Sequence, residues 1–115
     1  MPANPYDRMF KAFADETRIR IVNLLAHGEL CVCDLMNVLH VGQSKISRHL
    51  AYLKSVGFVT HRQKGLWRYY ALSKPQSRFH KRLLDCLSTC FDEATIVKKD
   101  EMRLKQLRRA KAKCC

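Results

Sequence analysis

The feature that most constrains the fold is a change of hydrophobic period at Gly57. Before this glycine, apolar residues recur at helical spacing over Ser44–Ser55. Beyond it, Phe58–Arg62 and Trp67–Leu72 alternate apolar and polar side chains and are rich in residues that favour strands. Gln63–Leu66 is expected to form the turn between them, so the sequence predicts a helix followed by a β-hairpin.

A shorter amphipathic helix is expected over Asp34–His40, joined to Ser44–Ser55 by the tight turn Val41–Gln43. Two helices joined by so short a turn are typical of a helix-turn-helix. Further helices are expected over Pro5–Ala14, from the N-cap Asp15 to His27-Gly28, and over Gln76–Val97. The order α-α-α-α-β-β-α predicts a winged helix-turn-helix, which is mainly helical with a β-hairpin as its wing.

The charge of the chain limits the kind of partner that it binds. Lys and Arg total 22 against 10 acidic residues, which gives a formal net charge of +12. Such a charge predicts a polyanionic partner, most simply nucleic acid. An anionic membrane surface is the weaker alternative, because no segment is long and apolar enough to span a membrane.

The N-terminal segment Met1–Pro5 lacks the charged start and apolar run of a secretory signal. We therefore expect a cytoplasmic protein, in a compartment where thiols are kept reduced. Its six cysteines are then expected to be free thiols or metal ligands rather than disulfides.

A strongly basic segment, Lys98–Lys113, follows the last expected helix and can itself be helical, with a thin apolar stripe formed by Met102, Leu104 and Leu107. We expect a DNA-binding and dimerisation domain over residues 1–97 and a basic C-terminal tail over residues 98–115, which ends in Cys114-Cys115. The tail is either a further DNA-binding arm or a solubilising segment.

Cys31-Val32-Cys33 stands immediately before the expected helix-turn-helix. Thiolates bind soft metal ions, so a metal site and a nucleic-acid-binding element would share a short stretch of chain. Cys33 takes the expected N-cap position of the helix over Asp34–His40, where the helix dipole lowers the pKa of a thiol. Residues two apart do not share a helix face, so an ion held by both sulfurs requires the first turn to unwind. The alternative is two buried cysteines that act as small hydrophobic residues.

Polar side chains gather at the start and on the outer face of the second helix of this motif. We expect DNA contacts from Gln43, Ser44, Lys45, Ser47, Arg48 and His49. Side chains near the N-terminus of a recognition helix meet base edges and phosphates in the major groove. On the wing, Arg62, Lys64 and Arg68 are expected to contact DNA, whereas Trp67, Tyr69 and Tyr70 are expected to pack within the hairpin.

Four stretches of the chain resemble the ArsR/SmtB family of small metal-responsive repressors, in its arsenical-resistance branch. They are Phe13–Ile21, Glu29–Leu35, Gln43–Leu50 and Gly65–Tyr70. The resemblance implies a homodimeric winged-helix repressor of an arsenic-resistance operon. It implies release from double-stranded operator DNA when trivalent arsenic or antimony binds Cys31 and Cys33, with no organic cofactor. The dimer interface is expected over Pro5–Ala14 and Gln76–Val97.

One position departs from the family pattern. Related arsenite sensors carry a third cysteine three residues after the second, and this chain has Met36 there. A thioether is a poor ligand for trivalent arsenic. The third ligand is therefore left open between Cys114 or Cys115, the helical pair Cys86 and Cys90, and a small thiol or water.

Other functions are left open by the residues alone. A regulator could instead sense another soft ion, or thiol oxidation that closes a disulfide within Cys31 and Cys33 or within Cys114 and Cys115. An enzyme such as a thiol-based arsenate reductase is disfavoured, because the chain has no Cys-x-x-Cys, no phosphate-cradling glycine loop and no βαβ pattern. A constitutive nucleoid-binding protein would need only the charge.

Overall fold

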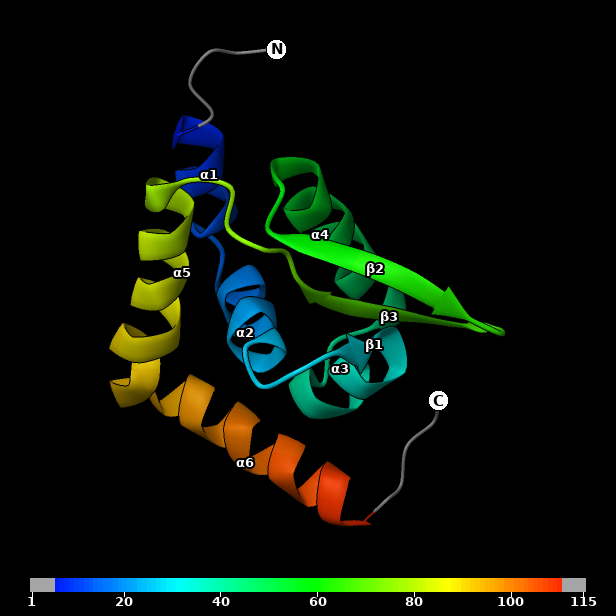
Figure 1. The fold of residues 1–115 in the computed structure, drawn as a ribbon. Coiled ribbons are helices and arrows are strands. Elements are labelled where there is room, and N and C mark those ends of the chain that lie inside the picture. Colours follow the sequence, from blue (N-terminus) through cyan, green and yellow to red (C-terminus); the bar gives the residue numbers. More distant parts are fainter. Residues whose placement is uncertain (1–5, 111–115) are drawn as a thin grey trace.

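The structure is a computed structural model that describes residues 6–110. Its elements follow the order α1 (Tyr6–Ala12), α2 (Glu16–Leu25), β1 (Leu30–Cys31), α3 (Val32–Leu39), α4 (Gln43–Val56), β2 (Val59–Lys64), β3 (Trp67–Leu72), α5 (Arg78–Cys90), a 3-10 turn (Phe91–Glu93) and α6 (Thr95–Ala110). In Figure 1, α3 and α4 form the helix-turn-helix, and β2 and β3 extend from it as a long hairpin. The expected winged helix-turn-helix is confirmed.

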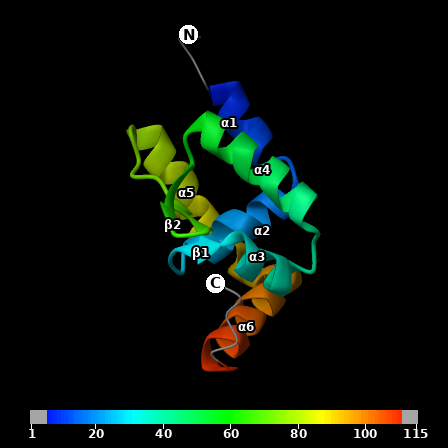
Figure 2. The ribbon, with the colours of Figure 1, turned by 90° about the vertical axis from the view of Figure 1, so that its right-hand side faces the viewer.

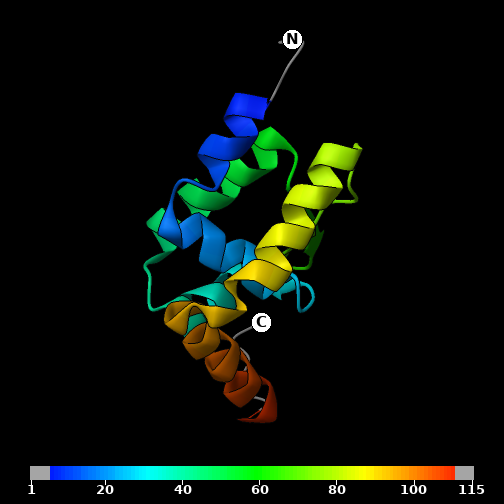
Figure 3. The ribbon, with the colours of Figure 1, turned by 90° about the vertical axis from the view of Figure 1, so that its left-hand side faces the viewer.

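Helix α2 lies in the middle of the molecule, with α4 on one side and α6 on the other (Figures 2 and 3). It contributes Ile21 and Leu24 to the core, where they are fully buried with Leu35 of α3 and Leu50 of α4. Burying a side chain of this size stabilises a fold by roughly 1.5–3 kcal/mol. The core therefore holds the two helices of the helix-turn-helix against a common support.

Local capping residues set the ends of these helices where the sequence predicted them. The side chain of Asp15 accepts a hydrogen bond from the backbone N–H of Arg18 and caps α2. Gly57 ends α4 in the left-handed region, with φ +94°. Glycine adopts that conformation without the steric penalty of a Cβ, so the chain turns directly from α4 into the wing.

The start of α3 differs from the expectation. The helix begins at Val32 rather than at Asp34, and its N-cap is Cys31 rather than Cys33. Cys31 also belongs to β1, a short strand that the sequence did not predict. Strand β1 pairs with β3 in a three-stranded antiparallel sheet of order β1-β3-β2. Two residues are too few to leave a periodic signal, so only tertiary pairing defines this strand.

The wing has a tighter turn than expected. Lys64 pairs with Trp67, which leaves only Gly65 and Leu66 to connect β2 and β3. Gly65 has φ +63°, and glycine at the first position of a two-residue turn is typical of hairpins whose twist matches their strands. The ladder therefore continues closer to the tip than the expected turn over Gln63–Leu66 allows.

A single helix over Gln76–Val97 is a wrong prediction, because Phe91–Glu93 forms a 3-10 turn that separates α5 from α6. The break redirects the chain, so that α6 packs across α2 and α3. Val97 and Leu104 of α6 are buried there, whereas Met102 is 60% exposed. The expected domain end at residue 97 falls within α6 and stays a prediction. No helix in the described part of the chain is long and apolar enough to cross a membrane.

Candidate thiol site and nucleic-acid interface

Cys31 lies where strand β1 meets helix α3. Its backbone pairs with Tyr69 of β3, and its Sγ accepts a hydrogen bond from the backbone N–H of Asp34 at 3.4 Å. The side chain is almost fully buried. The sulfur therefore caps α3, and the residue that carries it is part of the sheet that forms the wing.

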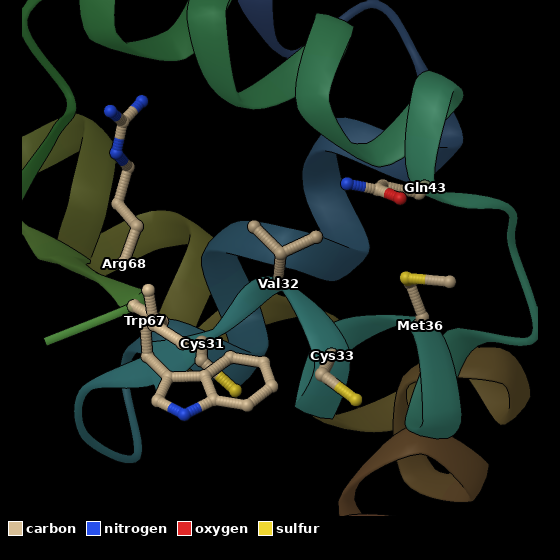
Figure 4. Close-up of a pocket in the computed structure, with 8 residues that line it drawn as sticks. Cys31, Val32, Cys33, Met36, Gln43, Trp67 and Arg68 are labelled. Atoms are coloured by element: carbon tan, nitrogen blue, oxygen red, sulfur yellow. The ribbon is translucent and has the colours of Figure 1, made fainter. Parts of the chain in front are cut away.

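Cys33 lies in the first turn of α3 and is half-buried. Cys31 and Cys33 line one cavity of about 400 Å³. Both are disulfide-bonded in the structure, so the expectation that the cysteines are free thiols or metal ligands rather than disulfides is wrong for these two. Figure 4 shows the two sulfur atoms on the same side of the chain. The remaining lining residues are Val32, Met36, Gln43, Leu66, Trp67 and Arg68. The cavity thus joins the start of α3 to the first residue of α4 and to the tip of the wing.

Trp67 corrects one sequence-based expectation. It was expected to pack within the hairpin, but its side chain is 43% exposed and it lines the cavity that holds the cysteines. In Figure 4 its indole lies beside Cys31. Tyr70 behaves as expected, with 8% exposure in the core. The alternation of the strand predicts which residues share a face, but not that one face ends over a cavity.

The other cysteines of the described chain lie elsewhere. Cys86 and Cys90 are exposed free thiols on α5, and α2 separates this helix from α3 (Figure 1). A hydrogen bond with the sulfur of Cys90 raises the pKa of Cys86. Within residues 6–110 no group of three or more His, Cys, Asp or Glu side chains is arranged to hold a metal ion. Cys114 and Cys115 lie outside the described residues.

Helix α4 presents an exposed polar face to solvent. Its members among the expected DNA contacts are Gln43, Ser44, Lys45, Ser47 and Arg48, all exposed. His49 does not belong to this face, because it is only 7% exposed. Its Nδ1 lies 3.2 Å from Nη1 of Arg18, and its Nε2 lies 3.9 Å from Asp15. The expectation that His49 lies on the outer face is therefore wrong, since this side chain anchors α4 to the start of α2.

The wing carries the remaining candidate cations. Lys64 and Arg68 are exposed near the tip. Arg62 is also exposed, but its guanidinium donates two hydrogen bonds of 2.7 Å to the carboxylate of Glu29. It also lies 5.2 Å from the centre of the Tyr69 ring. Glu29 immediately precedes β1, so this ion pair connects the wing to the segment that leads into Cys31.

Sequence comparison decides the family. A model of bacterial regulatory proteins of the arsR family matches residues 15–61, which include α2, α3 and α4. The arsenical resistance operon repressor of Escherichia coli K12 is 45% identical over 87 residues, which cover 75% of this chain and 74% of that repressor. The chain belongs to the ArsR family. This ArsR-family protein is therefore a DNA-binding transcriptional regulator and not an enzyme, as the sequence predicted.

Further relatives agree with this family assignment. The arsenic resistance transcriptional regulator ArsR1 of Pseudomonas putida KT2440 is 52% identical over 65 residues, covering 56% of this chain and 51% of that regulator. HlyU from Vibrio cholerae N16961 has a TM-score of 0.68 and 32% identity, covering 79% of this chain and 98% of HlyU. The homodimeric winged helix-turn-helix domain of Mb0332 from Mycobacterium bovis has a TM-score of 0.64 and 30% identity, covering 77% of this chain and 80% of that domain.

Proposed function

We propose that this ArsR-family protein represses an arsenic-resistance operon and leaves its operator DNA when trivalent arsenic or antimony binds Cys31 and Cys33. The names of the arsenical resistance repressors to which it is similar support an inducer of this kind. The observation that carries the proposal is the position of Cys31, which caps α3 and pairs with the wing strand β3.

The donor set fits the proposed inducer. Trivalent arsenic and antimony are thiophilic, and two sulfur donors line one cavity. In the reduced protein Cys31 and Cys33 would hold the inducer, which supplies the bonds that tie the two sulfurs to one centre. Thioether sulfur does not exchange a proton, so Met36 contributes contact surface rather than a bond.

The same geometry connects the two cysteines to helix α4, so a change at the cysteines can move the proposed recognition helix. The sulfur of Cys31 caps α3 through Asp34, and withdrawing it leaves an unpaired N–H at the start of the helix. Helix α3 packs against α4, and Gln43 at the start of α4 lines the same cavity. A bound inducer that favours an unwound first turn therefore favours a shifted recognition helix, and its differential affinity for the two states drives release.

We propose that the DNA-contact face consists of Gln43, Ser44, Lys45, Ser47 and Arg48, with Lys64 and Arg68 on the wing. The exposure of the first five residues at the start of α4 supports this assignment, because side chains near the N-terminus of a recognition helix meet base edges. The two wing cations lie beyond the ion-paired Arg62. Arg62 also contacts DNA when a backbone phosphate replaces the carboxylate of Glu29 as its hydrogen-bond partner.

We further propose a homodimer that forms through α1 and α5. Tyr6 and Phe10 of α1 are 47% and 57% exposed, and both rings contact Phe79 of α5. Exposed aromatic groups that form a cluster favour a protein interface over solvent. A two-fold axis at this face would give the pair of recognition helices that operator half-sites require.

Fluorescence anisotropy of the reduced protein on DNA from the promoter of its own operon tests the proposal. Arsenite or antimonite at fixed salt is expected to release the wild-type protein, and Cys31→Ser and Cys33→Ser are expected to bind DNA but resist release. Cys86→Ser is the matched control, since its thiol lies on α5, and it should respond as wild type. Release that survives in Cys33→Ser would contradict the proposal. Selective release by cadmium or peroxide would favour a different inducer.

A further inference from the structure

We propose that the outer face of α6 is a second DNA-binding surface, independent of base sequence, which binds the phosphate backbone of a duplex other than the one that α4 contacts. This face, the α6 stripe, consists of Lys98, Lys105 and Arg109, with Lys99 beside them, and all four side chains are exposed. The inference goes beyond the proposed function, because it involves neither the cysteines nor an inducer.

The α6 stripe follows from the helical repeat. Lys98, Lys105 and Arg109 are seven and four residues apart, so their side chains project from the same side of the helix. The opposite side of α6 is buried through Val97, Asp100 and Leu104. At the rise of an α-helix, the stripe is about 16 Å long, which is about half a turn of a DNA duplex. Three cations in a row of this length can contact successive phosphates of one backbone.

The stripe lies on the other side of the molecule from the recognition helix. Helix α6 packs against α2 and α3, and α2 lies between α6 and α4 (Figures 2 and 3). Ile46 and Leu50 of α4 and Leu104 of α6 belong to one buried core, so the exposed faces of α4 and α6 point away from each other. A straight duplex bound along α4 therefore leaves the α6 stripe open to a second duplex.

Contacts within the protein explain two other cations of α6 but not the stripe. Arg103 donates to the carbonyl of Val38 at 3.4 Å, and Arg108 donates to the carbonyl of His27 at 3.2 Å. By contrast, the side chains of the stripe form no hydrogen bond or ion pair within residues 6–110. Like charges four residues apart, such as Lys105 and Arg109, weaken a helix. The stability of α6 therefore does not account for this arrangement.

The acidic side chains of α6 do not neutralise the stripe. Asp100 forms an ion pair with Arg20 in the interior. Glu101 lies 2.9 Å from Nε2 of His27. The stripe therefore keeps its positive charge, and a phosphate backbone that contacts it releases bound counterions, which favours binding.

DNA fits the stripe better than an anionic membrane surface does. A helix that binds a membrane surface buries an apolar face among the lipids, but the apolar face of α6 is buried in the fold through Val97 and Leu104. A duplex needs only phosphate contacts and no apolar insertion. Because an ArsR-family regulator acts on DNA, other segments of DNA surround it whenever it is bound to its operator.

A capture assay tests for two DNA-binding surfaces on one protein. The reduced full-length protein is bound to bead-immobilised duplex from the promoter of its own operon, and free protein is washed away. A fluorescent duplex of random sequence is then added, with protein-free beads as the background. We expect wild type to retain the fluorescent duplex on the beads. The retention should fall with salt with a log–log slope of about 2.7, which corresponds to three phosphate contacts.

Two double variants with the same change of charge separate the stripe from the overall charge of the protein. The variant Lys98→Gln, Lys105→Gln removes two cations of the stripe and is expected to weaken retention about tenfold or more. Its affinity for the promoter duplex should stay within about twofold of wild type, because α4 and the wing are unchanged. The control Lys54→Gln, Lys74→Gln removes two exposed lysines outside the proposed DNA-contact face and should retain the fluorescent duplex as wild type does.

Three results would overturn the inference. The first is the absence of retention by wild type, or equal retention by the variant Lys98→Gln, Lys105→Gln. The second is weaker binding of that variant to the promoter duplex, with a salt slope lower by about 1.8, since the stripe would then contact the same duplex as α4. The third is capture of phosphatidylserine vesicles in place of the random duplex, which would assign the stripe to a membrane surface. Retention by wild type and the control, lost in the stripe variant, supports the inference.

Discussion

Arg20 of α2 and Asp100 of α6 form a bidentate ion pair in the interior of the protein. Nε and Nη2 of Arg20 lie 2.8 and 2.9 Å from the two carboxylate oxygens, and Asp100 is 1% exposed. Nη2 of Arg20 also donates to the carbonyl of Leu39, at the end of α3. The hydrogen bonds that Arg20 donates to the carboxylate of Asp100 raise the pKa of Arg20 above its ordinary value. One buried guanidinium therefore joins α6, α2 and the end of α3.

Removal of the carboxylate should weaken the fold strongly. We expect Asp100→Ala to lower the free energy of unfolding by about 3–5 kcal/mol, because it leaves Arg20 buried without a counter-charge. The double variant Arg20→Met, Asp100→Leu should recover most of this loss, since it removes both charges. Urea unfolding followed by circular dichroism measures both values. A loss below about 1 kcal/mol in Asp100→Ala would show that this ion pair contributes no more than an exposed one.

Two substitutions of Cys31 should differ in their effect on the stability of the fold but not in their effect on the response to arsenic. Ser is a better N-cap than cysteine, so Cys31→Ser should keep or slightly raise the melting temperature. Cys31→Ala removes the acceptor for the N–H of Asp34 and should cost about 1 kcal/mol. Both variants should lose the response to trivalent arsenic. Thermal unfolding and DNA release, measured on the same preparations, test the pair, and equal stabilities would contradict the capping role.

The ion pair between Glu29 and Arg62 should hold back DNA binding. The guanidinium of Arg62 donates two hydrogen bonds of 2.7 Å to the carboxylate of Glu29. Glu29→Gln removes the charge of that partner. If Arg62 then takes a phosphate, the log–log salt slope of DNA binding steepens by about 0.9. Glu93→Gln changes the net charge equally at an exposed residue next to α5, so it should leave that slope nearly unchanged. Equal slopes for the two variants would contradict this assignment.

Buried histidines should make the fold sensitive to mild acid. Burial lowers the pKa of His49 below its ordinary value of 6.5, an effect that the charge of Asp15 partly opposes. Burial also lowers the pKa of His80. As the pH falls, these histidines therefore take up protons at a higher pH in the unfolded chain than in the folded one, which favours unfolding. The free energy of unfolding keeps its full value above about pH 7 and declines below about pH 6.5.

The unfolding free energy should decline by up to about 1.4 kcal/mol per pH unit for each of these histidines. Urea unfolding between pH 5 and pH 8 measures the decline, and the variants His49→Gln and His80→Gln should each flatten it. An unchanged slope in both variants would assign the acid sensitivity to other groups.

Much of the scaffold follows from signals that act over a few residues. Asp15 predicts the start of α2 because its carboxylate bonds to an N–H within the next turn. Gly57 predicts the end of α4 because only glycine takes its left-handed backbone at low cost. The alternating segments on either side of Gly65 predict the wing for the same local reason.

The functional geometry depends on contacts between distant segments, which no local pattern encodes. The pairing of Cys31 with Tyr69 defines β1 and moves the helix cap from Cys33 to Cys31. The break after α5 allows Asp100 to reach Arg20, although the periodicity of Gln76–Val97 predicted one continuous helix. The polar side chain of His49 suggested an exposed position, but His49 lies three residues after Ile46 and four before Leu53, on the buried face of α4. Arg18 and Asp15 approach its ring there from the start of α2.

The sequence by itself determined the winged helix-turn-helix, its recognition helix and the thiol pair at its entrance, because periodicity, caps and turns are properties of neighbouring residues. Only the tertiary structure decided that Trp67 and Leu66 lie over the same cavity as Cys31 and Cys33. That arrangement requires β3 of the wing to pair with β1. The pairing is stabilised by backbone hydrogen bonds between segments that are far apart in the chain.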